Sequence, residues 1–396
     1  MKRFLKVLWI MLALAVLAAS SACTIKKKTK DENKAFTFGI VKSVLGDTSI
    51  DPDTGIEHEE KFGGVYIRIT IDDFNALGFS FGDSVDVEFT SGFALYDIPY
   101  YNGFYVDMGE PLLVGYPGYP YIRVGYNNGE DMYAVAKLTP SDTATVALNQ
   151  KGKYLAEQQA MDIHYSDEQG DKSDAVFANF RAVSVGNLKE NVLYRSASPC
   201  DNRHKRAAIA DRLIRAAGVN FIINLSDNEA ELSKHIEKED FDSPYFLTLY
   251  EAGKVVPLSM SMAYKLDAFS EKLVRGLTAA SKAQGPYLVH CVEGKDRTGF
   301  VCMVIEALAG ATYDEIVDDY MITYDNYYSV NKTSDPEKYE IIKSKQIDTM
   351  LEYITGDCGV DITTADYATY AVSYLKSIGM AEEDIKALKA AFVKAA

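Results

Sequence analysis

Basic charge is scarce in this chain of 396 residues. Lysine and arginine number 41 against 57 aspartates and glutamates, which gives a formal net charge of −16 at pH 7. Proteins that bind nucleic acid gain most of their affinity from a basic face that displaces counterions from phosphates. The charge balance therefore argues against a nucleic-acid-binding protein, while a local basic pocket is still compatible with it.

Cysteine and histidine are also scarce. The five cysteines show no regular spacing: Cys23, Cys200, Cys291, Cys302 and Cys358. Such spacing predicts no disulfide framework, and no set of histidine, cysteine and carboxylate residues has the spacing of a zinc site. We therefore expect neither a metal nor an organic cofactor. A protective disulfide between Cys200 and Cys291 is one alternative for these thiols, and free, inert thiols are the simpler one.

Long hydrophobic runs are absent except at the start of the chain. Residues 1–6 are basic, residues 7–19 are apolar, and small residues precede Cys23. This order predicts a signal peptide over residues 1–22, because the apolar run is short for a membrane span. A cysteine after small residues resembles a bacterial lipoprotein cleavage box, although Ser20 replaces its usual branched aliphatic residue. Simple export with cleavage after Ala22 is the alternative.

The segment that follows the predicted signal is charged and non-periodic. Residues 23–35 contain five lysines and predict a flexible tether between the membrane and the first folded domain. If Cys23 carries a lipid, the protein is anchored to a membrane outside the cytoplasm. If it does not, the protein is secreted.

Residues 290–299 read His-Cys-Val-Glu-Gly-Lys-Asp-Arg-Thr-Gly. They follow a short apolar run, residues 286–290, which predicts a buried strand, and they lead into residues 298–308, which predict a buried helix. A loop that closes onto a helix N-terminus points backbone N–H groups at one spot, which suits a phosphate dianion and favours the thiolate form of Cys291. Arg297 adds a planar fork for two phosphate oxygens. The segment therefore predicts a nucleophile within a phosphate cradle.

Residues 36–150 differ in pattern from the rest of the chain. Apolar and polar side chains alternate over residues 65–71 and 85–89, and turn signals separate such runs. The pattern predicts a small all-β domain, either a barrel or a sandwich. Nine tyrosines lie between Tyr96 and Tyr133. They can form an exposed binding surface or serve simply as strand residues.

Residues 151–396 alternate short strands with amphipathic helices. Residues 203–217 and 261–283 have helical patterns, and residues 219–225 have the pattern of a strand. A polar segment at residues 166–174 marks the approach to this region. The alternation predicts an α/β domain, a central sheet flanked by helices.

The loop at residues 290–299 resembles that of the atypical bacterial tyrosine phosphatases, which read His-Cys-x-x-Gly-Lys-Asp-Arg-Thr-Gly. Weaker marks of the resemblance are residues 179–181, 193–197 and 222–225, and the resemblance covers residues 176–396. It implies a cysteine-dependent phosphatase domain that works through a phosphocysteine intermediate. Some members of this family also act on phosphoserine, phosphothreonine or phosphoinositides.

The resemblance implies that Asp296 is the general acid. Asp227, which follows a predicted strand, is the alternative. His290 is expected to hydrogen-bond near Cys291 and help keep the thiolate, and Thr298 to donate to the sulfur. The residues expected to contact substrate are Val292, Glu293, Gly294, Lys295 and Asp227. Among them, Glu293 departs from the family's small residue, and its carboxylate should weaken phosphate binding unless it points away.

Three functions compete at this stage. One is an exported phosphatase for phosphotyrosine, with or without dual specificity. The second is a phosphoinositide or inositol-phosphate phosphatase, supported by Lys295 and by the basic cluster at residues 203–206. The third is an inactive module that recognises phosphate, against which the intact Cys291 and Arg297 argue. The substrate partner is accordingly a phosphorylated protein or a phosphoinositide.

Overall fold

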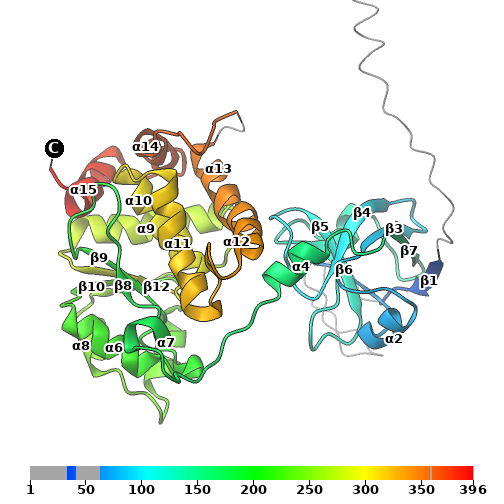
Figure 1. Ribbon diagram of the computed structural model, residues 1–396, viewed down its shortest axis with the longest axis horizontal. Helices are drawn as coiled ribbons and strands as arrows, with labels where there is room; N and C mark the ends of the chain where they lie inside the picture. The colour runs from blue at the N-terminus through cyan, green and yellow to red at the C-terminus, as the bar shows by residue number, and fades with distance from the viewer. Residues whose placement is uncertain (1–33, 42–62, 357–358, 396) are drawn as a thin grey trace, which may run out of the picture.

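The computed structural model describes residues 34–41, 63–356 and 359–395. The predicted signal peptide, the lipidation site at Cys23 and nearly all of the predicted tether lie outside these ranges, as does Cys358. Within them the chain forms two parts, one of strands and one of helices around a sheet (Figure 1). No helix in the described ranges is both long and apolar enough to cross a bilayer.

The first part is a closed seven-stranded barrel. Its sheet has the order β1-β7-β3-β4-β5-β6-β2, with antiparallel neighbours except for the parallel pair β4–β5. The sheet closes because Ile40, next to β1, bridges to Ile67 of β2. The strands are β1 (Ala35–Gly39), β2 (Val65–Ile67), β3 (Ser84–Phe89), β4 (Ala94–Tyr101), β5 (Pro111–Val114), β6 (Ile122–Tyr126) and β7 (Thr143–Gln150). Closure removes the exposed edges that an open sheet would carry. The predicted all-β domain is therefore confirmed as a barrel.

Two short helices interrupt the barrel strands, α2 (Ile71–Ala76) and α3 (Met132–Val135). The alternating run at residues 65–71 predicted a single strand, and this was wrong in its second half. The strand ends at Ile67, and Thr70 caps α2 by accepting the backbone N–H of Asp73 at 3.1 Å. A threonine side chain that caps a helix accepts a backbone N–H of the first helical turn. The alternation of apolar and polar residues gives no sign of this bond.

The barrel tyrosines serve mainly as packing residues. Tyr100, Tyr101 and Tyr133 are buried, while Tyr96 and Tyr116 are exposed by 62% and 44%. The remaining four of the nine are partly buried. Four of the nine lie in strands, namely Tyr96, Tyr100, Tyr101 and Tyr126, so the strand-residue interpretation holds for fewer than half of them.

The second part is an α/β domain around a five-stranded sheet of order β11-β10-β12-β9-β8. The first four strands are parallel, and β8 pairs antiparallel with β9. The strands are β8 (Arg181–Ala182), β9 (Leu193–Ser196), β10 (Phe221–Asn224), β11 (Val255–Pro257) and β12 (Tyr287–His290). The predicted α/β fold is confirmed.

Helices cover both faces of this sheet (Figure 1). One face packs against a core that includes Leu232 and Phe246, and the helices on it are α6 (Ala207–Ala216), α7 (Glu229–Ile236) and α8 (Pro244–Glu251). The other face packs against the larger core around Phe300. The helices on that side are α9 (Asp267–Lys282), α10 (Asp296–Leu308), α11 (Tyr313–Tyr328), α12 (Pro336–Ile342), η2 (Lys343–Asp348), α13 (Thr349–Thr355), α14 (Tyr367–Ser377) and α15 (Glu382–Phe392).

Two of the predicted helices begin later than expected. The segment at residues 203–217 forms a short turn, η1 (Asn202–His204), and α6 starts only at Ala207 because Lys205 has a left-handed backbone with φ 56°. The helix predicted from residue 261 starts at Asp267. In both cases the tertiary path of the connecting loop overrides the local helical pattern.

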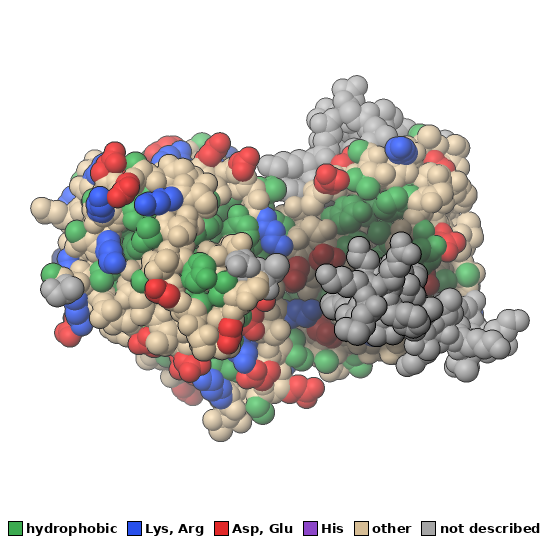
Figure 2. Space-filling model, turned by 90° about the horizontal axis from the view of Figure 1, so that it is seen from above, with side chains coloured by type: hydrophobic (Ala, Val, Ile, Leu, Met, Phe, Trp, Pro, Cys, Tyr) green, Lys and Arg blue, Asp and Glu red, His purple; other side chains and the backbone are tan. Residues whose placement is uncertain are grey.

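The two parts are joined through α4 (Leu155–Met161), which packs against α12, and through residues 162–173, called the linker below. The Nδ2 of Asn102 in the barrel donates to the Asp162 carboxylate at 2.7 Å. At the far end of the linker, α5 (Asp174–Phe177) begins the α/β part. Seen from above, the surface is hollowed where the two parts meet, and acidic and basic side chains lie close together there (Figure 2).

Candidate active site

The segment from Cys291 to Arg297, called the phosphate loop below, lies between β12 and the N-terminus of α10. β12 is flanked by β9 and β10, so the loop leaves the carboxyl edge of the parallel strands, where ligands bind in open α/β sheets. Gly294 has φ +69°, and a Cβ there would collide with the carbonyl oxygen of Ser196. Only glycine lets the loop pass this close to β9.

Cys291 and Arg297 occupy the positions that the sequence pattern requires. Cys291 is a free thiol with 3% exposure, five residues before the start of α10, whose dipole favours an anion at that end. One guanidinium nitrogen of Arg297 donates to the carbonyl of Met260 at 3.0 Å. Within the described ranges its other N–H groups have no protein partner, so they are available to phosphate oxygens.

Buried charges support the loop from below. The guanidinium of Arg195 on β9 donates to the carbonyls of Gly294 at 3.0 Å and Lys295 at 3.3 Å, and it pairs with Asp319 on α11 at 2.7 Å. Arg181 contacts the same carboxylate at 2.9 Å. Burial alone would raise the pKa of Asp319, but the two guanidinium groups hold that pKa below its usual range. The carboxylate therefore stays ionised and fixes both arginines.

Two further side chains hold the carbonyl of Glu293. The Nδ2 of Asn179 donates to this carbonyl at 3.3 Å and to that of Gly294 at 3.2 Å, and the Tyr327 hydroxyl donates to the Glu293 carbonyl at 2.6 Å. Together with Arg195, these bonds fix the carbonyls of residues 293–295 on the protein side. With the carbonyls turned away, the backbone N–H groups are left to line an anion-binding cradle.

Lys295 and Glu293 neutralise one another in part. The Nζ of Lys295 lies 5.6 Å from the ring centres of both Tyr324 and Tyr328, and 3.8 Å from the Glu293 carboxylate. Glu293 also accepts a hydrogen bond from the Tyr165 hydroxyl at 2.8 Å. Burial raises the pKa of Tyr165, and the nearby Glu293 charge raises it further, so this hydroxyl remains a donor. Glu293, which stands where the family has a small residue, thus receives a hydrogen bond from a tyrosine of the linker.

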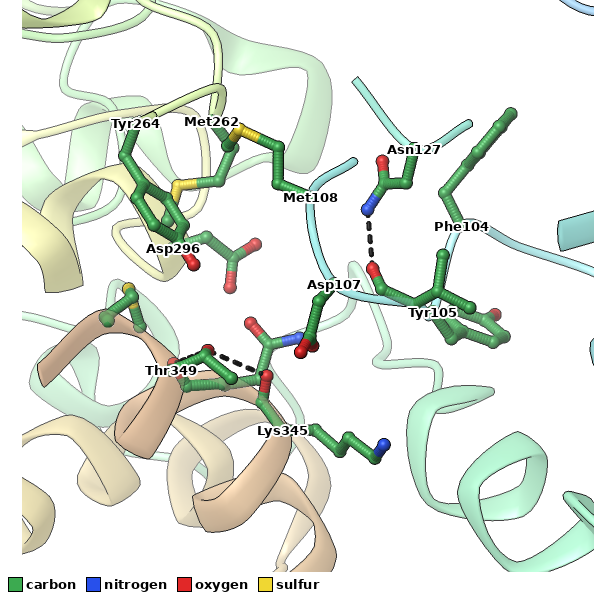
Figure 3. A pocket seen from close by; sticks show the side chains of 13 residues that line it. Phe104, Tyr105, Asp107, Met108, Asn127, Met262, Tyr264, Asp296, Lys345 and Thr349 are labelled. Atoms are coloured by element: carbon green, nitrogen blue, oxygen red, sulfur yellow. Dashed lines mark hydrogen bonds between the residues drawn. The ribbon is translucent and has the colours of Figure 1, made fainter. Parts of the chain in front are cut away.

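The two candidate acids occupy different environments. Asp296 is 37% exposed, lies 3.6 Å from the Nζ of Lys295 and accepts from the Tyr320 hydroxyl at 3.3 Å. It lines a cleft of about 210 Å³ between the barrel and the α/β part, called the interdomain cleft below. Figure 3 shows its carboxylate in this cleft. A partly exposed carboxyl within the loop can reach both a leaving group and water.

Asp227 is buried and fully hydrogen-bonded. Its carboxylate accepts from Asn224 and Ser226, each at 2.9 Å, and lies 3.3 Å from His235. Burial raises the pKa of Asp227, but the hydrogen bonds from Asn224 and Ser226 outweigh this and leave the pKa below its usual value. Asp227 is therefore held as a carboxylate and is a poor proton donor.

His290 and Thr298 differ in detail from their expected contacts. The Nδ1 of His290 donates to the Cys291 carbonyl at 3.2 Å, and burial lowers the pKa of His290 to about 4, so the ring is neutral at pH 7. It orders the backbone at Cys291 and supplies no positive charge to the sulfur. The Thr298 hydroxyl is buried, with no hydrogen-bond partner in the described ranges, Cys291 included.

The basic cluster at residues 203–206 is paired with acids. Arg203 contacts Asp201 at 2.5 Å, and Arg206 and His204 both contact Asp167 of the linker at 3.0 Å. Lys205 pairs with Glu168. The Arg206 guanidinium also lies 4.8 Å from the ring centre of Tyr165. The cluster therefore anchors the linker, and this is its main structural role.

A second cavity, of about 380 Å³, is lined by Val292 and Arg297 of the phosphate loop. It is also lined by the cations Arg203, Lys234 and Lys238 and by the acids Asp227 and Glu231. Cys200 lies next to Asp227 and is a free thiol, so the disulfide alternative with Cys291 is not formed. Burial raises the pKa of the Cys200 thiol.

Sequence reasoning missed the residues that support the loop from a distance. Asp319 lies on α11 beside apolar positions of the core, and a buried acid on such a face signals a partner of opposite charge. Tyr327 lies on the same helix, about two turns after Asp319. Tyr165 lies in a polar segment and carries no such signal.

The chain is similar in sequence to known proteins. Residues 177–394 match a family described as the tyrosine phosphatase family. A tyrosine-protein phosphatase of Nostoc commune is 29% identical over 207 residues, which cover 46% of this chain and 70% of that protein. Among solved structures, the core catalytic domain of a PP-IP phosphatase from S. cerevisiae is 22% identical, covering 45% of this chain and 91% of its own, with a TM-score of 0.26.

TpbA of P. aeruginosa, solved in complex with pTyr, is 18% identical and covers 43% of this chain and 92% of its own, with a TM-score of 0.25. The family match spans more than half of the 396 residues and contains the whole phosphate loop. The chain belongs to the tyrosine phosphatase family and is a phosphatase.

Proposed function

We propose that this protein hydrolyses phosphotyrosine through a phosphocysteine intermediate, with Cys291 as nucleophile and Asp296 as general acid. The observation that carries the proposal is the loop geometry: a free thiol sits before a helix N-terminus, inside a loop whose carbonyls at residues 293–295 are tied away by Asn179, Arg195 and Tyr327. Such a cradle stabilises the charge on the equatorial phosphate oxygens.

In the first step, the Cys291 thiolate attacks phosphorus in line, and an S–P bond forms as the P–O bond to the leaving group breaks. Asp296 gives its proton to the leaving oxygen, which departs as a neutral hydroxyl. Arg297 and the loop N–H groups hold the three non-bridging oxygens throughout.

In the second step, water attacks the phosphocysteine. Asp296, now a carboxylate, takes the proton from this water, the S–P bond breaks and the sulfur leaves as thiolate. Thr298 supports this departure by donating its otherwise unpartnered hydroxyl to the sulfur. Inorganic phosphate then leaves, and the enzyme returns to its starting state.

The test is hydrolysis of p-nitrophenyl phosphate in the presence of a chelator. The Cys291→Ser variant should lose about 10⁴-fold or more in kcat, because removal of a nucleophile abolishes the covalent route. Cys302→Ala is the matched control. Cys302 is a fully buried thiol on α10, five residues beyond Arg297 and outside the phosphate loop, and this variant should keep its activity. Equal activity of Cys291→Ser and the intact protein would refute the mechanism.

Inositol phosphates are the second candidate substrate. The supporting observation is the cavity beside Arg297, where Arg203, Lys234 and Lys238 gather. Lys234 and Lys238, which line this cavity together with Arg297, favour a ligand with more than one phosphate. Comparing kcat/KM for a phosphotyrosyl peptide and for inositol hexakisphosphate separates the two candidates.

The proposal extends to location. Cys23 carries a lipid after removal of residues 1–22, and the mature protein acts on the outer side of a membrane. The sequence of the first 35 residues supports this, since a basic start, an apolar run and a cysteine after small residues are typical of lipoprotein signals. Fractionation of cells that produce the full chain tests it: Cys23→Ala should move the protein from the membrane to the soluble fraction.

A further inference from the structure

The interdomain cleft lies on the side of the phosphate loop where Asp296 is found. The barrel forms one wall with residues 104–108, and the α/β part forms the other with Met262, Tyr264 and residues 345–350. A general acid must reach the leaving oxygen. If Asp296 is that acid, the leaving group lies beside Asp296, at the edge of a cleft whose other wall is the barrel.

The barrel wall is held in a fixed shape. The ring of Tyr105 covers Gly103 so closely that a Cβ on Gly103 would collide with it. The Nδ2 of Asn127 donates to the Val106 carbonyl at 2.6 Å. Across the cleft, the Nζ of Lys265 donates to the Met108 carbonyl at 3.3 Å. The wall is thus preorganised, which reduces the entropy lost when a ligand binds.

The cleft combines an apolar floor with an acidic rim. Met108 lies beside Met262 and Tyr264, and the Asp107 and Asp296 carboxylates both lie in the cleft (Figure 3). Asp107 is partly buried, and its carboxylate makes no hydrogen bond or ion pair with any residue of the described ranges. The Lys345 side chain extends away from both carboxylates (Figure 3). The cleft therefore offers one unpaired negative charge next to the apolar floor.

We propose that this cleft is a substrate-recognition site in which Asp107 selects phosphotyrosyl peptides with a lysine or arginine next to the phosphotyrosine. The inference rests on the proposed function above. The methionines and Tyr264 suit the tyrosine ring, and Asp107 pairs with the neighbouring cation. A polyphosphorylated inositol would bring further negative charge toward Asp107 and Asp296, and like charges oppose binding. The barrel is thereby a specificity domain of the enzyme.

The test uses two phosphotyrosyl peptides that differ only in a lysine or a glutamate next to the phosphotyrosine. The readout is the ratio of their kcat/KM values on one enzyme sample, so that any partial loss of folding or of activity cancels. The intact protein should prefer the lysine peptide. Asp107→Asn should lower this ratio by about threefold to fivefold, as expected for an ion pair that is only partly buried. Asp107→Lys should reverse the preference.

The matched control is Glu110→Gln, which removes a charge from an exposed position three residues away and outside the cleft. It should leave the ratio unchanged. A ratio that does not respond to either Asp107 variant overturns the inference, while turnover of p-nitrophenyl phosphate still upholds the proposed function. Preference for inositol hexakisphosphate over both peptides also overturns it. Absence of any turnover by the intact protein overturns the proposed function itself.

Discussion

The interiors of the barrel and of the α/β part contain different kinds of buried side chain. In the barrel, the buried side chains are almost all aliphatic or aromatic, and Asp83 is the one buried charge among its described residues. The α/β part buries Arg195, Asp319 and His290 close to the phosphate loop, and Glu306 beside Asp319. Apolar burial stabilises without regard to partner or pH, whereas buried charges stabilise only when paired. The barrel interior therefore stabilises the barrel. The buried charges of the α/β part also hold the phosphate loop in its shape.

We expect the largest effect on stability from Asp319→Asn. The substitution removes the ionised carboxylate that contacts both Arg195 and Arg181, so the free energy of unfolding of the α/β part should fall by about 3–5 kcal/mol. Because Arg195 also holds the loop carbonyls, kcat for p-nitrophenyl phosphate should fall with it. Urea unfolding and steady-state kinetics measure the two effects.

Asp318→Asn is the control for this experiment, since Asp318 is the neighbouring residue, is exposed, and pairs with Lys332 on the surface. It should change stability by less than about 1 kcal/mol. If the two variants behave alike, the buried charges do not support the loop.

The second prediction concerns pH. His290 has a folded-state pKa of about 4, below its ordinary 6.5, so the unfolded chain binds the extra proton first as pH falls. The stabilising contribution is therefore complete above pH 6.5 and is lost between pH 6.5 and about 4. A shift of this size corresponds to about 3 kcal/mol. Urea unfolding at a series of pH values should show a shallower acid slope for His290→Asn than for the intact protein.

His164→Asn provides the comparison for that series, because the His164 side chain is exposed. Its acid slope should match that of the intact protein. Parallel slopes for His290→Asn and the intact protein would mean that His290 does not remain neutral in the folded state.

The smallest effect is expected from the barrel. Val124 is fully buried on β6, and Val124→Ala should lower the free energy of unfolding of the barrel by about 2 kcal/mol through lost apolar burial. While the barrel remains folded, kcat for p-nitrophenyl phosphate should not change. Leu155→Ala, at an exposed position of α4, should leave stability within about 0.5 kcal/mol. Loss of aryl phosphate turnover with Val124→Ala would show that the two interiors are coupled.

Local pattern predicted much of this molecule. The strand–loop–helix order around Cys291 was confirmed because β12 and α10 are both buried and carry continuous apolar runs. The all-β character of the first part followed from alternation along strands such as β3, while the choice between barrel and sandwich did not. These features depend on neighbours in sequence, which is the distance over which hydrophobic periodicity gives information.

The supports of the loop could not be predicted in the same way. Asp319 is hydrogen-bonded to Arg195, which is 124 residues away in the sequence. Tyr165 is hydrogen-bonded to Glu293, which is 128 residues away. No periodicity joins residues so far apart. The same holds for Asp107, since nothing in the barrel sequence indicates that its 104–108 segment faces Asp296. Pairings of this kind are set by how the helices and the barrel pack, after the local elements have formed.

The contacts of the linker also limit where the chain can be truncated to obtain a catalytic fragment. The family match begins at residue 177, yet Tyr165 and Asp167 lie before it and contact Glu293 and Arg206. A fragment that starts at residue 177 would retain Cys291 and Arg297 but would leave Glu293 at the mouth of the loop without its hydroxyl donor. A catalytic fragment that keeps this hydrogen bond must therefore begin at or before Tyr165, twelve residues ahead of the family match.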